Sequence, residues 1–541
     1  MRRLLGSVAC LTVAGAAKGA DLPGPDAAPV DYVRTCTAHG NSFFYIPGTD
    51  TCLRISGRAR FQGSYLQVYY RGNSNNGGDI IGYQGQGRFA FDARTQTDYG
   101  LLRSFVRYDI GYGTGPYLAL GAARFVGLNV VAQAADTFNR GNATVGVDKA
   151  FIQFAGFTAG RAASFYDFYA RDFELIGLSL TSDVAATNLL AYSAKIGNGF
   201  SATLSIEDPL YRHTPMFGNG TTTNVFSQYV AFVPGRGNFA PVLGTNAAGE
   251  PIVADIDMAK RSRMPDFVGA LRYDGEWGAA QVSAAVHELN VGLANGTRAI
   301  AGVSTAGAVA PRPSNEYAWA VQAGVKVNLP FIAKGDSIYL QGAYSQGAVR
   351  YTGYSNPFPW LSNNPVSAGA GVNTWMSNAV LDPLTGKLDP STSWTVVSSL
   401  LHYWVPEWRS AFFGSYGEVS FGKASRANVG LVSSLLGGPI NLPSPANPAF
   451  AFSGILRDTN LTTVGASLIW SPVRDLDIGF EAVYARIATA EGSVVDTNKA
   501  PGQVATGVNA AGQPVNAAGA VLPTRSVGDT IQLRLRIQRD F

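Results

Sequence analysis

The chain has 541 residues, with 63 glycines, 24 tyrosines and 29 phenylalanines, while charged residues make up only 14%. Although 46% of the residues are apolar, they nowhere form an uninterrupted run of about 18, which excludes the usual transmembrane helix. Leaving out the first twenty residues removes three of the 41 basic side chains and none of the 37 acidic ones. The remaining net charge of about +1 gives no reason to expect binding to nucleic acid.

The first twenty residues have the pattern of a secretory signal. Arg2 and Arg3 precede an apolar stretch over 4–17, and small residues follow before Asp21. This stretch is too short to anchor the chain in a membrane, so we expect residues 1–20 to direct export and then to be removed. Cleavage after Ala17 instead of Ala20 stays open, because Lys18 is unfavourable so close to the later position.

Two cysteines, Cys36 and Cys52, remain after export, since Cys10 lies inside the signal. In an oxidising compartment such a pair forms a disulfide, and a bridge of this span stabilises a fold by about 3 kcal/mol. Two unpaired thiols are the alternative, whereas a metal site is disfavoured because only His39 is near. We therefore expect residues 21–52 to form a periplasmic segment with a disulfide-closed knot, followed by one domain over 53–541.

Residues 317–329 show the predicted strand pattern clearly. Large apolar residues, with one alanine among them, alternate there with small or polar residues. A period of two sustained over thirteen residues excludes a helix. Such a strand is longer than most strands of soluble sheets and matches the tilted span of a bilayer.

The same alternation recurs along the chain and predicts sixteen strands. Their expected ranges are 53–69, 86–96, 101–111, 146–155, 157–165, 188–197, 200–207, 266–274, 278–288, 316–329, 336–350, 394–404, 410–421, 460–471, 476–488 and 527–541. Seven of the connections are short, and they alternate with eight long ones that include 208–265 and 351–393. A β-sandwich or propeller would not explain this asymmetry. We predict an all-β fold, a transmembrane antiparallel β-barrel of 16 strands with eight long outside loops and seven short periplasmic turns.

The last predicted strand, 527–541, has one apolar and one polar face and ends on Phe541. A final aromatic residue resembles the assembly signal of outer-membrane barrels, and we expect Phe541 to serve in that role. The strand must pair with the first one, because lipid offers no partner for the backbone groups of an open sheet edge.

Three stretches carry a family pattern: YVRTC at 32–36, FFYIPGTDTCLR at 43–54 and AGFTAGRAASFYD at 155–167. The first two resemble the N-terminal signature of the alphaproteobacterial (Rhizobiales-type) outer-membrane porin family. The third resembles that family's segment leading into the third outside loop. The resemblance implies a homotrimer of sixteen-stranded barrels in outer-membrane lipid, with passive, weakly ion-selective diffusion of small hydrophilic solutes.

Sixteen strands enclose an aqueous channel, so function is expected on the inward face. Arginines recur at the polar positions of the first three strands and the last, which are neighbours in a closed meander. These residues are Arg54, Arg58, Arg60, Arg88, Arg94, Arg103, Arg107, Arg534 and Arg536. We predict that they form a basic wall of the pore. Arginines that only solvate the lumen, pair with acids or extend to its ends are the alternative.

The third outside loop, 166–187, is expected to form the opposite wall, because in general porins this loop folds inward and narrows the channel. Its acids are Asp167, Asp172, Glu174 and Asp183, partly offset by Arg171. An ordinary exposed loop is the alternative. Across a gap comparable to the Debye length, about 8 Å at physiological salt, the local field would set the ion preference. The number of arginines favours anions, although the sign of the selectivity stays open.

Other functions fit this sequence less well. A channel selective for anions or sugars is the nearest alternative, because dense arginines could bind one solute class. An enzyme would need a positioned base and nucleophile, and none of the four histidines has an evident serine and acid partner. An adhesin would not need an arginine-rich interior. We predict a passive outer-membrane porin without catalytic residues, metal or cofactor.

Overall fold

The computed structural model describes most of the chain from Arg34 onward. The described residues are 34–40, 42–66, 81–114, 142–184, 186–213, 242–245, 247–248, 251–256, 263–290, 294–299, 315–354, 377–382, 385–428, 448–454, 456–496, 499–500, 503 and 505–541. The predicted signal, 1–20, lies outside these residues. No helix among them is both long enough and apolar enough to cross a membrane.

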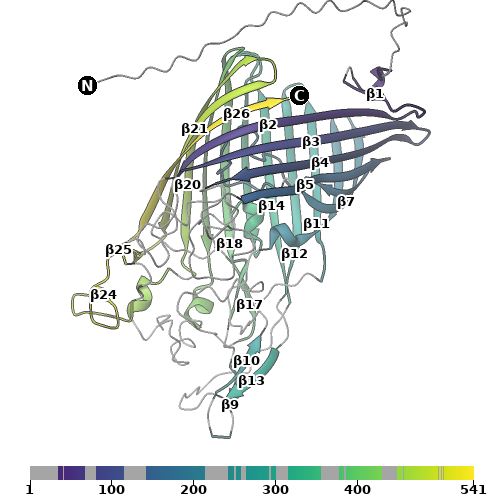
Figure 1. The fold of residues 1–541 in the computed structure, drawn as a ribbon. Coiled ribbons are helices and arrows are strands. Elements are labelled where there is room, and N and C mark those ends of the chain that lie inside the picture. Colours follow the sequence, from purple (N-terminus) through teal and green to yellow (C-terminus); the bar gives the residue numbers. More distant parts are fainter. Residues whose placement is uncertain are drawn as a thin grey trace, which may run out of the picture.

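Sixteen strands form one closed antiparallel barrel (Figure 1). They are β2 (Cys52–Leu66), β3 (Ile81–Thr97), β4 (Gly100–Gly113), β5 (Asn142–Phe154), β6 (Phe157–Ala162), β7 (Thr187–Gly197), β8 (Phe200–Glu207), β11 (Asp266–Gly275), β12 (Gly278–Leu289), β14 (Glu316–Asn328), β15 (Ser337–Gln346), β18 (Thr392–Val405), β19 (Trp408–Ser420), β20 (Thr459–Val473), β21 (Leu476–Thr489) and β26 (Val527–Asp540). Each pairs with the next along the chain, and β26 pairs with β2 to close the sheet. The predicted fold class and strand number are confirmed.

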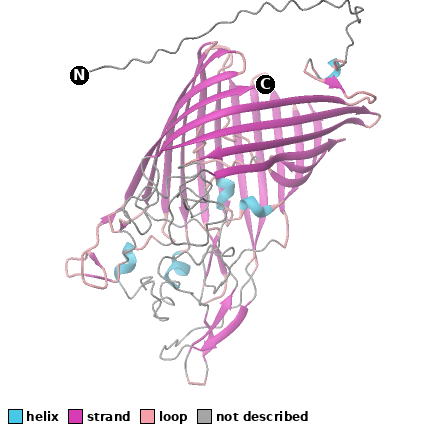
Figure 2. Ribbon diagram, in the orientation of Figure 1, coloured by secondary structure: helices cyan, strands magenta, loops and turns pink. Residues whose placement is uncertain are grey.

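Tight turns and long loops gather at opposite ends of the barrel (Figure 2). Two-residue turns such as 98–99 and 198–199 lie at the end where the C-terminus is found. The opposite loops carry small sheets of two or three strands and short helical turns. These are β9 (Val242–Thr245), β10 (Pro251–Ile256), β13 (Ala294–Ala299), β16 (Ala379–Leu381), β17 (Leu388–Pro390), β22 (Val494–Val495), β23 (Gly507–Val508), β24 (Pro514–Val515), β25 (Thr524–Arg525), η3 (Pro209–Arg212), η4 (Val349–Thr352) and η5 (Pro448–Phe452).

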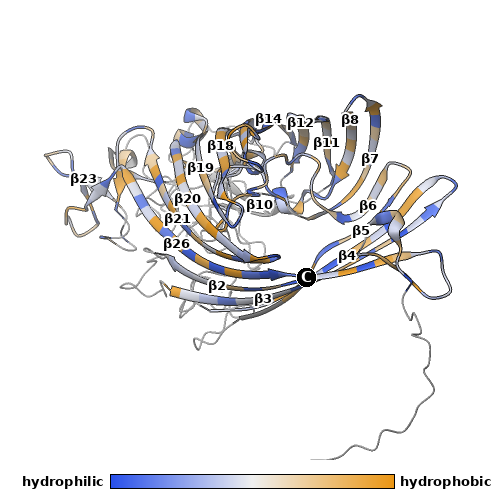
Figure 3. Cartoon of the chain, turned by 90° about the horizontal axis from the view of Figure 1, so that it is seen from above, coloured by the Kyte–Doolittle hydropathy of each residue, from blue (hydrophilic) through white to orange (hydrophobic). Residues whose placement is uncertain are grey.

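Hydrophilic and hydrophobic residues alternate along the strands (Figure 3), and successive side chains of a strand point to opposite faces of the barrel. On β14, Tyr317 and Trp319 are 60% and 41% exposed on the outer face, whereas Ala318 and Ala320 are at most 1% exposed. Large apolar side chains exposed all around a closed sheet require a hydrocarbon environment. The outer face therefore suits lipid.

Aromatic pairs border the apolar face toward both ends. Trp408 stacks on Trp470 near the turns, while Trp394 and Tyr416 lie 5.4 Å apart toward the loops. Along β19, Trp408 and Tyr416 are separated by about 26 Å of strand at the usual rise per residue. This separation fits the apolar band of a tilted outer-membrane strand.

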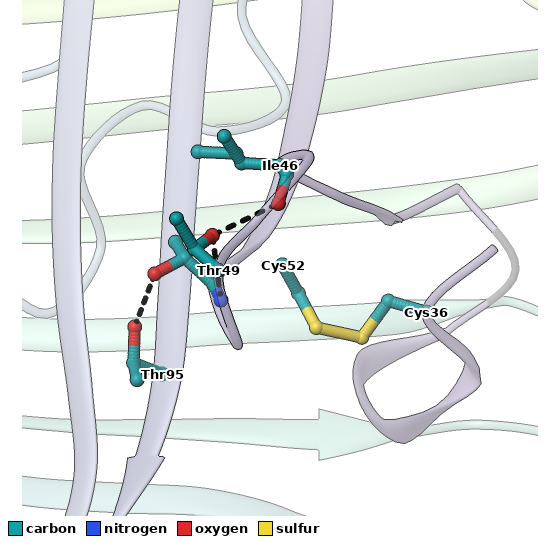
Figure 4. The surroundings of a disulfide bond; sticks show 6 residues. Cys36, Ile46, Thr49, Cys52 and Thr95 are labelled. Carbon is teal, nitrogen blue, oxygen red and sulfur yellow. Dashed lines mark hydrogen bonds between the residues drawn. A yellow bond between two sulfur atoms is a disulfide. The ribbon is translucent and has the colours of Figure 1, made fainter. Parts of the chain in front are cut away.

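The predicted disulfide joins Cys36 to Cys52, with Cα atoms 5.9 Å apart. It closes a knot that contains η1 (Thr37–His39) and β1 (Phe44–Tyr45), and β1 pairs with the start of β2. The Thr51 and Thr95 hydroxyls share a hydrogen bond of 2.9 Å, which ties the end of the knot to β3 (Figure 4). The knot is thereby fixed at the turn end of the barrel.

Candidate functional site

The nine predicted wall arginines lie on four neighbouring strands, β26, β2, β3 and β4. Cross-strand pairing places Arg58 opposite Arg88 and Arg94 opposite Arg103. The alternate positions on the same strands carry exposed apolar side chains such as Phe89, so the arginines face inward. The structure brings all nine onto one inner surface, called the basic wall below.

Three arginines of the basic wall converge on one buried aspartate near the turns. Arg94 and Arg103 each bind the Asp92 carboxylate through two hydrogen bonds of 2.8–3.1 Å. Arg54 Nη2 lies 3.6 Å from the same carboxylate, whose side chain is 2% exposed. One carboxylate offsets only one of the three guanidinium charges, so this end of the wall keeps a positive excess.

Two further arginines, Arg58 and Arg88, each form a close ion pair, and Arg88 Nη2 also lies 3.8 Å from Asp148. Arg58 Nε donates to Asp540 at 2.6 Å. Arg88 donates to both carboxylate oxygens of Asp109, each at 2.6 Å. Such paired arginines keep a fixed geometry, and their net contribution to the charge of the wall is small.

Arg107 pairs with Asp148, a lumen residue that strand alternation did not predict. The register of β4 and β5 shifts between Arg107 and Tyr108, so one residue of β5 is extra at this point. The bulge allows Asp148 to face the wall arginines although its neighbour Lys149 pairs with Arg107. The sequence does contain a signal for this bulge, because Asp148 and Lys149 are charged neighbours within one strand. In a regular strand they would point to opposite faces, and only one of them would face the aqueous lumen.

The remaining three wall arginines bind neutral oxygens. Arg60 donates to the side-chain oxygens of Gln538 and Gln86 at 2.6–3.3 Å. In the part of the chain that the structure describes, no carboxylate lies within 4.0 Å of Arg60. Arg534 and Arg536 both donate to the carbonyl oxygen of Leu175, at 2.8 and 2.5 Å. The basic wall therefore contacts the third outside loop directly.

That loop, residues 163–184 and 186, lies along the inside of the barrel and is called loop 3. Its backbone is bound by inward side chains of six strands between β12 and β26: Gln281, Ser283, Gln322, Gln341, Ser415, Glu481, Arg534 and Arg536. Glu481 accepts hydrogen bonds from the Leu175 and Ile176 amides at 2.7 and 2.6 Å. With contacts from β12 round to β26, loop 3 crosses the lumen and narrows it.

The four predicted acids of loop 3 do not lie together. Glu174 is buried and accepts hydrogen bonds from the amides of Leu178 and Ser179, so it supports the loop itself. Asp172 is exposed, with the Tyr339 hydroxyl 3.4 Å away. Asp183 is partly buried, 3.7 Å from Arg171 and near enough to Lys149 of β5 to interact electrostatically. Burial raises the pKa of Asp183 to about 6.

Asp167, the fourth acid, belongs to a buried cluster at the base of loop 3, and no sequence pattern indicated this cluster. Arg212 of η3 donates to Asp167 and to Ser164 at 2.9 and 3.0 Å, and its guanidinium lies 4.0 Å from the Tyr351 ring centre. Burial alone would lower the pKa of Arg212, but Asp167 and its other anionic neighbours raise it above its ordinary value. The arginine thus stays charged and joins loop 3 to two neighbouring loops.

Both histidines on strands have an acid partner, contrary to the sequence expectation. His287 Nδ1 lies 2.5 Å from Asp266, and His402 Nδ1 lies 2.6 Å from Asp336. Among the described residues, no hydrogen bond joins His402 to a hydroxyl group. Nor do the described residues contain a cluster of three or more metal-ligating side chains.

Residues 24–510 match the model of a family described as the porin subfamily. The chain belongs to this porin family. It is 29% identical to porin Omp2a of Brucella suis biovar 1 over 377 residues, which cover 68% of this porin and 79% of Omp2a. It is likewise 29% identical to porin Omp2b of Brucella suis over 356 residues, covering 64% and 74% of the two chains. The protein is an outer-membrane porin, a channel rather than an enzyme.

Two solved structures resemble this porin at low sequence identity. The outer membrane channel DcaP of Acinetobacter baumannii gives a TM-score of 0.49 at 12% identity, covering 92% of this chain and 99% of DcaP. An anion-selective porin from Comamonas acidovorans gives a TM-score of 0.39 at 8% identity, covering 91% and 100%.

Proposed function

We propose that small hydrophilic solutes diffuse passively between the basic wall and loop 3, and that this constriction prefers anions. The supporting observation is the charge balance of the wall. Its nine arginines and Lys149 are accompanied on the same strands by four inward carboxylates, Asp92, Asp109, Asp148 and Asp540. The excess of positive charge raises the local concentration of anions.

Loop 3 contributes less negative charge to the gap than its sequence suggests. Asp167 is paired with Arg212, and Glu174 is used by loop amides. Asp172 and Asp183 are the loop acids with exposed or partly exposed carboxylates. The basic side chains of the wall therefore outnumber the carboxylates of the wall and of loop 3 taken together, which supports anion preference over cation preference.

The test is the reversal potential of reconstituted channels across a potassium chloride gradient. Replacing Arg58, Arg60 and Arg107 by glutamine should shift the reversal potential toward cation preference. Arg474→Gln is the matched control, because Arg474 lies in a turn with 94% of its side chain exposed. If the triple variant keeps the wild-type reversal potential, these three arginines do not line the constriction that sets the ion preference.

A channel selective for one class of anion or sugar is the second candidate, favoured by Arg60, which lies near Arg536 and has no carboxylate partner among the described residues. Saturable block of the single-channel current by one solute class would support it over general diffusion. We also propose that the porin assembles as a homotrimer and that Phe541 acts as its assembly signal. The trimer is tested by measuring the mass of the purified protein in detergent by light scattering.

A further inference from the structure

Apolar rings on the inner face of this porin are unexpected, because the lumen is aqueous. Phe105 of β4 lies opposite Phe151 of β5, and both share the inward side with Arg103. The rings are stacked with centroids 5.3 Å apart, and both side chains are half-buried. The two rings together offer a partly accessible aromatic surface to the lumen.

This aromatic pair adjoins the arginines around Asp92. The Arg103 guanidinium carbon lies 5.2 Å from the Phe105 ring centre and 5.5 Å from that of Phe151. The same Arg103 binds Asp92 through two hydrogen bonds. Aromatic faces and guanidinium groups thus form one continuous surface near the turn end of the basic wall.

The disulfide-closed knot supports the other side of this surface. Phe43 of the knot lies 4.8 Å from the Arg94 guanidinium and 5.2 Å from that of Arg54, measured to its ring centre. The Phe43 side chain is 2% exposed and packs with Cys36 and Cys52. Because Arg54 and Arg94 face the lumen, the knot covers the inner face at this end of the wall and holds both arginines in place.

The arginines here retain capacity to bind an anion. Arg94 uses Nε and Nη2 for Asp92, and its Nη1 donates to no described residue. Arg54 forms no hydrogen bond with the described part of the chain, and its closest ionic contact to Asp92 is 3.6 Å. Arg54, Arg94 and Arg103 together outnumber the single carboxylate by two charges. A ligand carboxylate can therefore bind these guanidinium groups without displacing Asp92.

We propose that this surface, formed by Arg54, Arg94, Arg103, Phe105 and Phe151, is a binding subsite for small aromatic carboxylates. The carboxylate binds the free guanidinium donors while the aromatic ring stacks against the phenylalanine pair and the face of Arg103. The inference rests on the proposed diffusion path, since the solute must reach the turn end of the wall. The subsite is expected to retain aromatic anions longer than aliphatic anions of the same charge.

The test compares benzoate with acetate on single channels of the wild-type porin in potassium chloride. Benzoate should reduce the time-averaged current with a saturable dependence on concentration, whereas acetate at equal concentration should leave it unchanged. Cyclohexanecarboxylate, which has the same charge and similar size without an aromatic face, should block more weakly than benzoate. Equal effects of benzoate and acetate would overturn the proposal without any variant.

The variant carrying both Phe105→Leu and Phe151→Leu tests whether benzoate blocks the channel by binding at the phenylalanine pair. Its block constant for benzoate should rise about tenfold, since each aromatic contact contributes roughly a factor of three to binding. Phe412→Leu is the matched control, because Phe412 lies on the lipid-facing side of β19 and is 45% exposed. The double variant should still conduct in potassium chloride alone. If benzoate then blocks it as strongly as the wild type, benzoate does not bind at Phe105 and Phe151.

The two proposals fail independently. A cation-preferring reversal potential together with benzoate block would overturn the anion preference and leave the subsite standing. An anion-preferring channel that benzoate does not block would overturn the subsite alone.

Discussion

Gly57 on the outer face of β2 has no side chain because the ring of Phe541 occupies that space. A Cβ atom at Gly57 would lie 2.3 Å from the Phe541 ring and 2.8 Å from the carbonyl oxygen of Arg88. The backbones of Gly57 and Phe541 also exchange two hydrogen bonds, of 2.8 and 3.0 Å. The closure of the barrel at its turn end therefore depends on the absence of a side chain at this position.

Gly57→Leu should displace the Phe541 ring and destabilise the barrel by about 1–3 kcal/mol, the usual cost of overpacking. The measurement is the denaturant midpoint of the folded barrel, read from its mobility on unheated gels. Gly85→Ala is the control on the neighbouring strand, because a Cβ atom there meets nothing within 4 Å. Equal midpoints for the two variants would show that the ring moves aside without cost.

Asp183 should make the ion preference depend on pH. Because burial raises the pKa of Asp183 to about 6, its carboxyl group is charged above this pH and neutral below it. Acidification from pH 7.5 to pH 5 removes a negative charge near Lys149, so the anion preference should rise, by about twofold for one charge at this range. Reversal potentials across this pH interval measure the effect. Asp183→Asn should show the acidic behaviour at every pH, and an unchanged pH dependence in this variant would assign the titration to another group.

Residue positions on the regular strands could be predicted from the sequence, and loop positions could not. All nine wall arginines follow from the two-residue period, because the parity of a strand fixes the face of each side chain. Asp148 escaped this rule through the bulge in β5. Asp167 and Glu174 were predicted as pore acids, but Asp167 meets Arg212 through tertiary folding, and Glu174 binds amides four and five residues further on in an irregular loop without a sequence period.

At the scale of elements, all sixteen strands were predictable because each must alternate between lipid and water. Predicted and observed bounds differ mainly at the loop ends, as for β3, which begins at Ile81 instead of residue 86. At the loop ends the strands extend beyond the lipid, so their outward residues need not be apolar. The alternation of apolar and polar residues is therefore lost there, although the backbone hydrogen bonds between strands continue. Loop 3 offers no period at all, and its course is set by inward side chains from distant strands.

Glu481 is the side chain that holds the tip of loop 3 against β21. Glu481→Ala removes both acceptors of the Leu175 and Ile176 amides, which should weaken the attachment of the tip by about 3 kcal/mol. We expect larger current fluctuations in single-channel recordings, because the tip then moves within the pore. Glu418→Ala removes a carboxylate that accepts from Trp394 and Tyr416 outside the lumen, and it should leave the current trace unchanged. If the current of Glu481→Ala fluctuates no more than that of the wild type, the other hydrogen bonds to loop 3 are enough to hold its tip in place.

For the molecule as a whole, the formal net charge is a poor guide to what the pore selects. The whole chain carries +4, yet the basic wall concentrates its excess positive charge on one part of the inner surface. Charges facing water act over a distance set by salt, about 10 Å at 0.1 M and about 3 Å at 1 M. A wall several ångströms from the permeating ion is therefore effective in dilute salt and screened in concentrated salt.

The anion preference should accordingly fall as the salt concentration rises. With a fixed ratio of potassium chloride across the membrane, the reversal potential should move toward zero when the mean concentration increases from 0.1 to 1 M, because counterions then screen the arginines. In the variant with Arg58, Arg60 and Arg107 replaced by glutamine, the reversal potential at 0.1 M should be closer to zero. It should also change less between 0.1 and 1 M. A wild-type preference that persists undiminished at 1 M would point to direct ion binding, since contact between a dehydrated anion and a guanidinium group resists screening. That outcome would favour the substrate-selective channel over general diffusion.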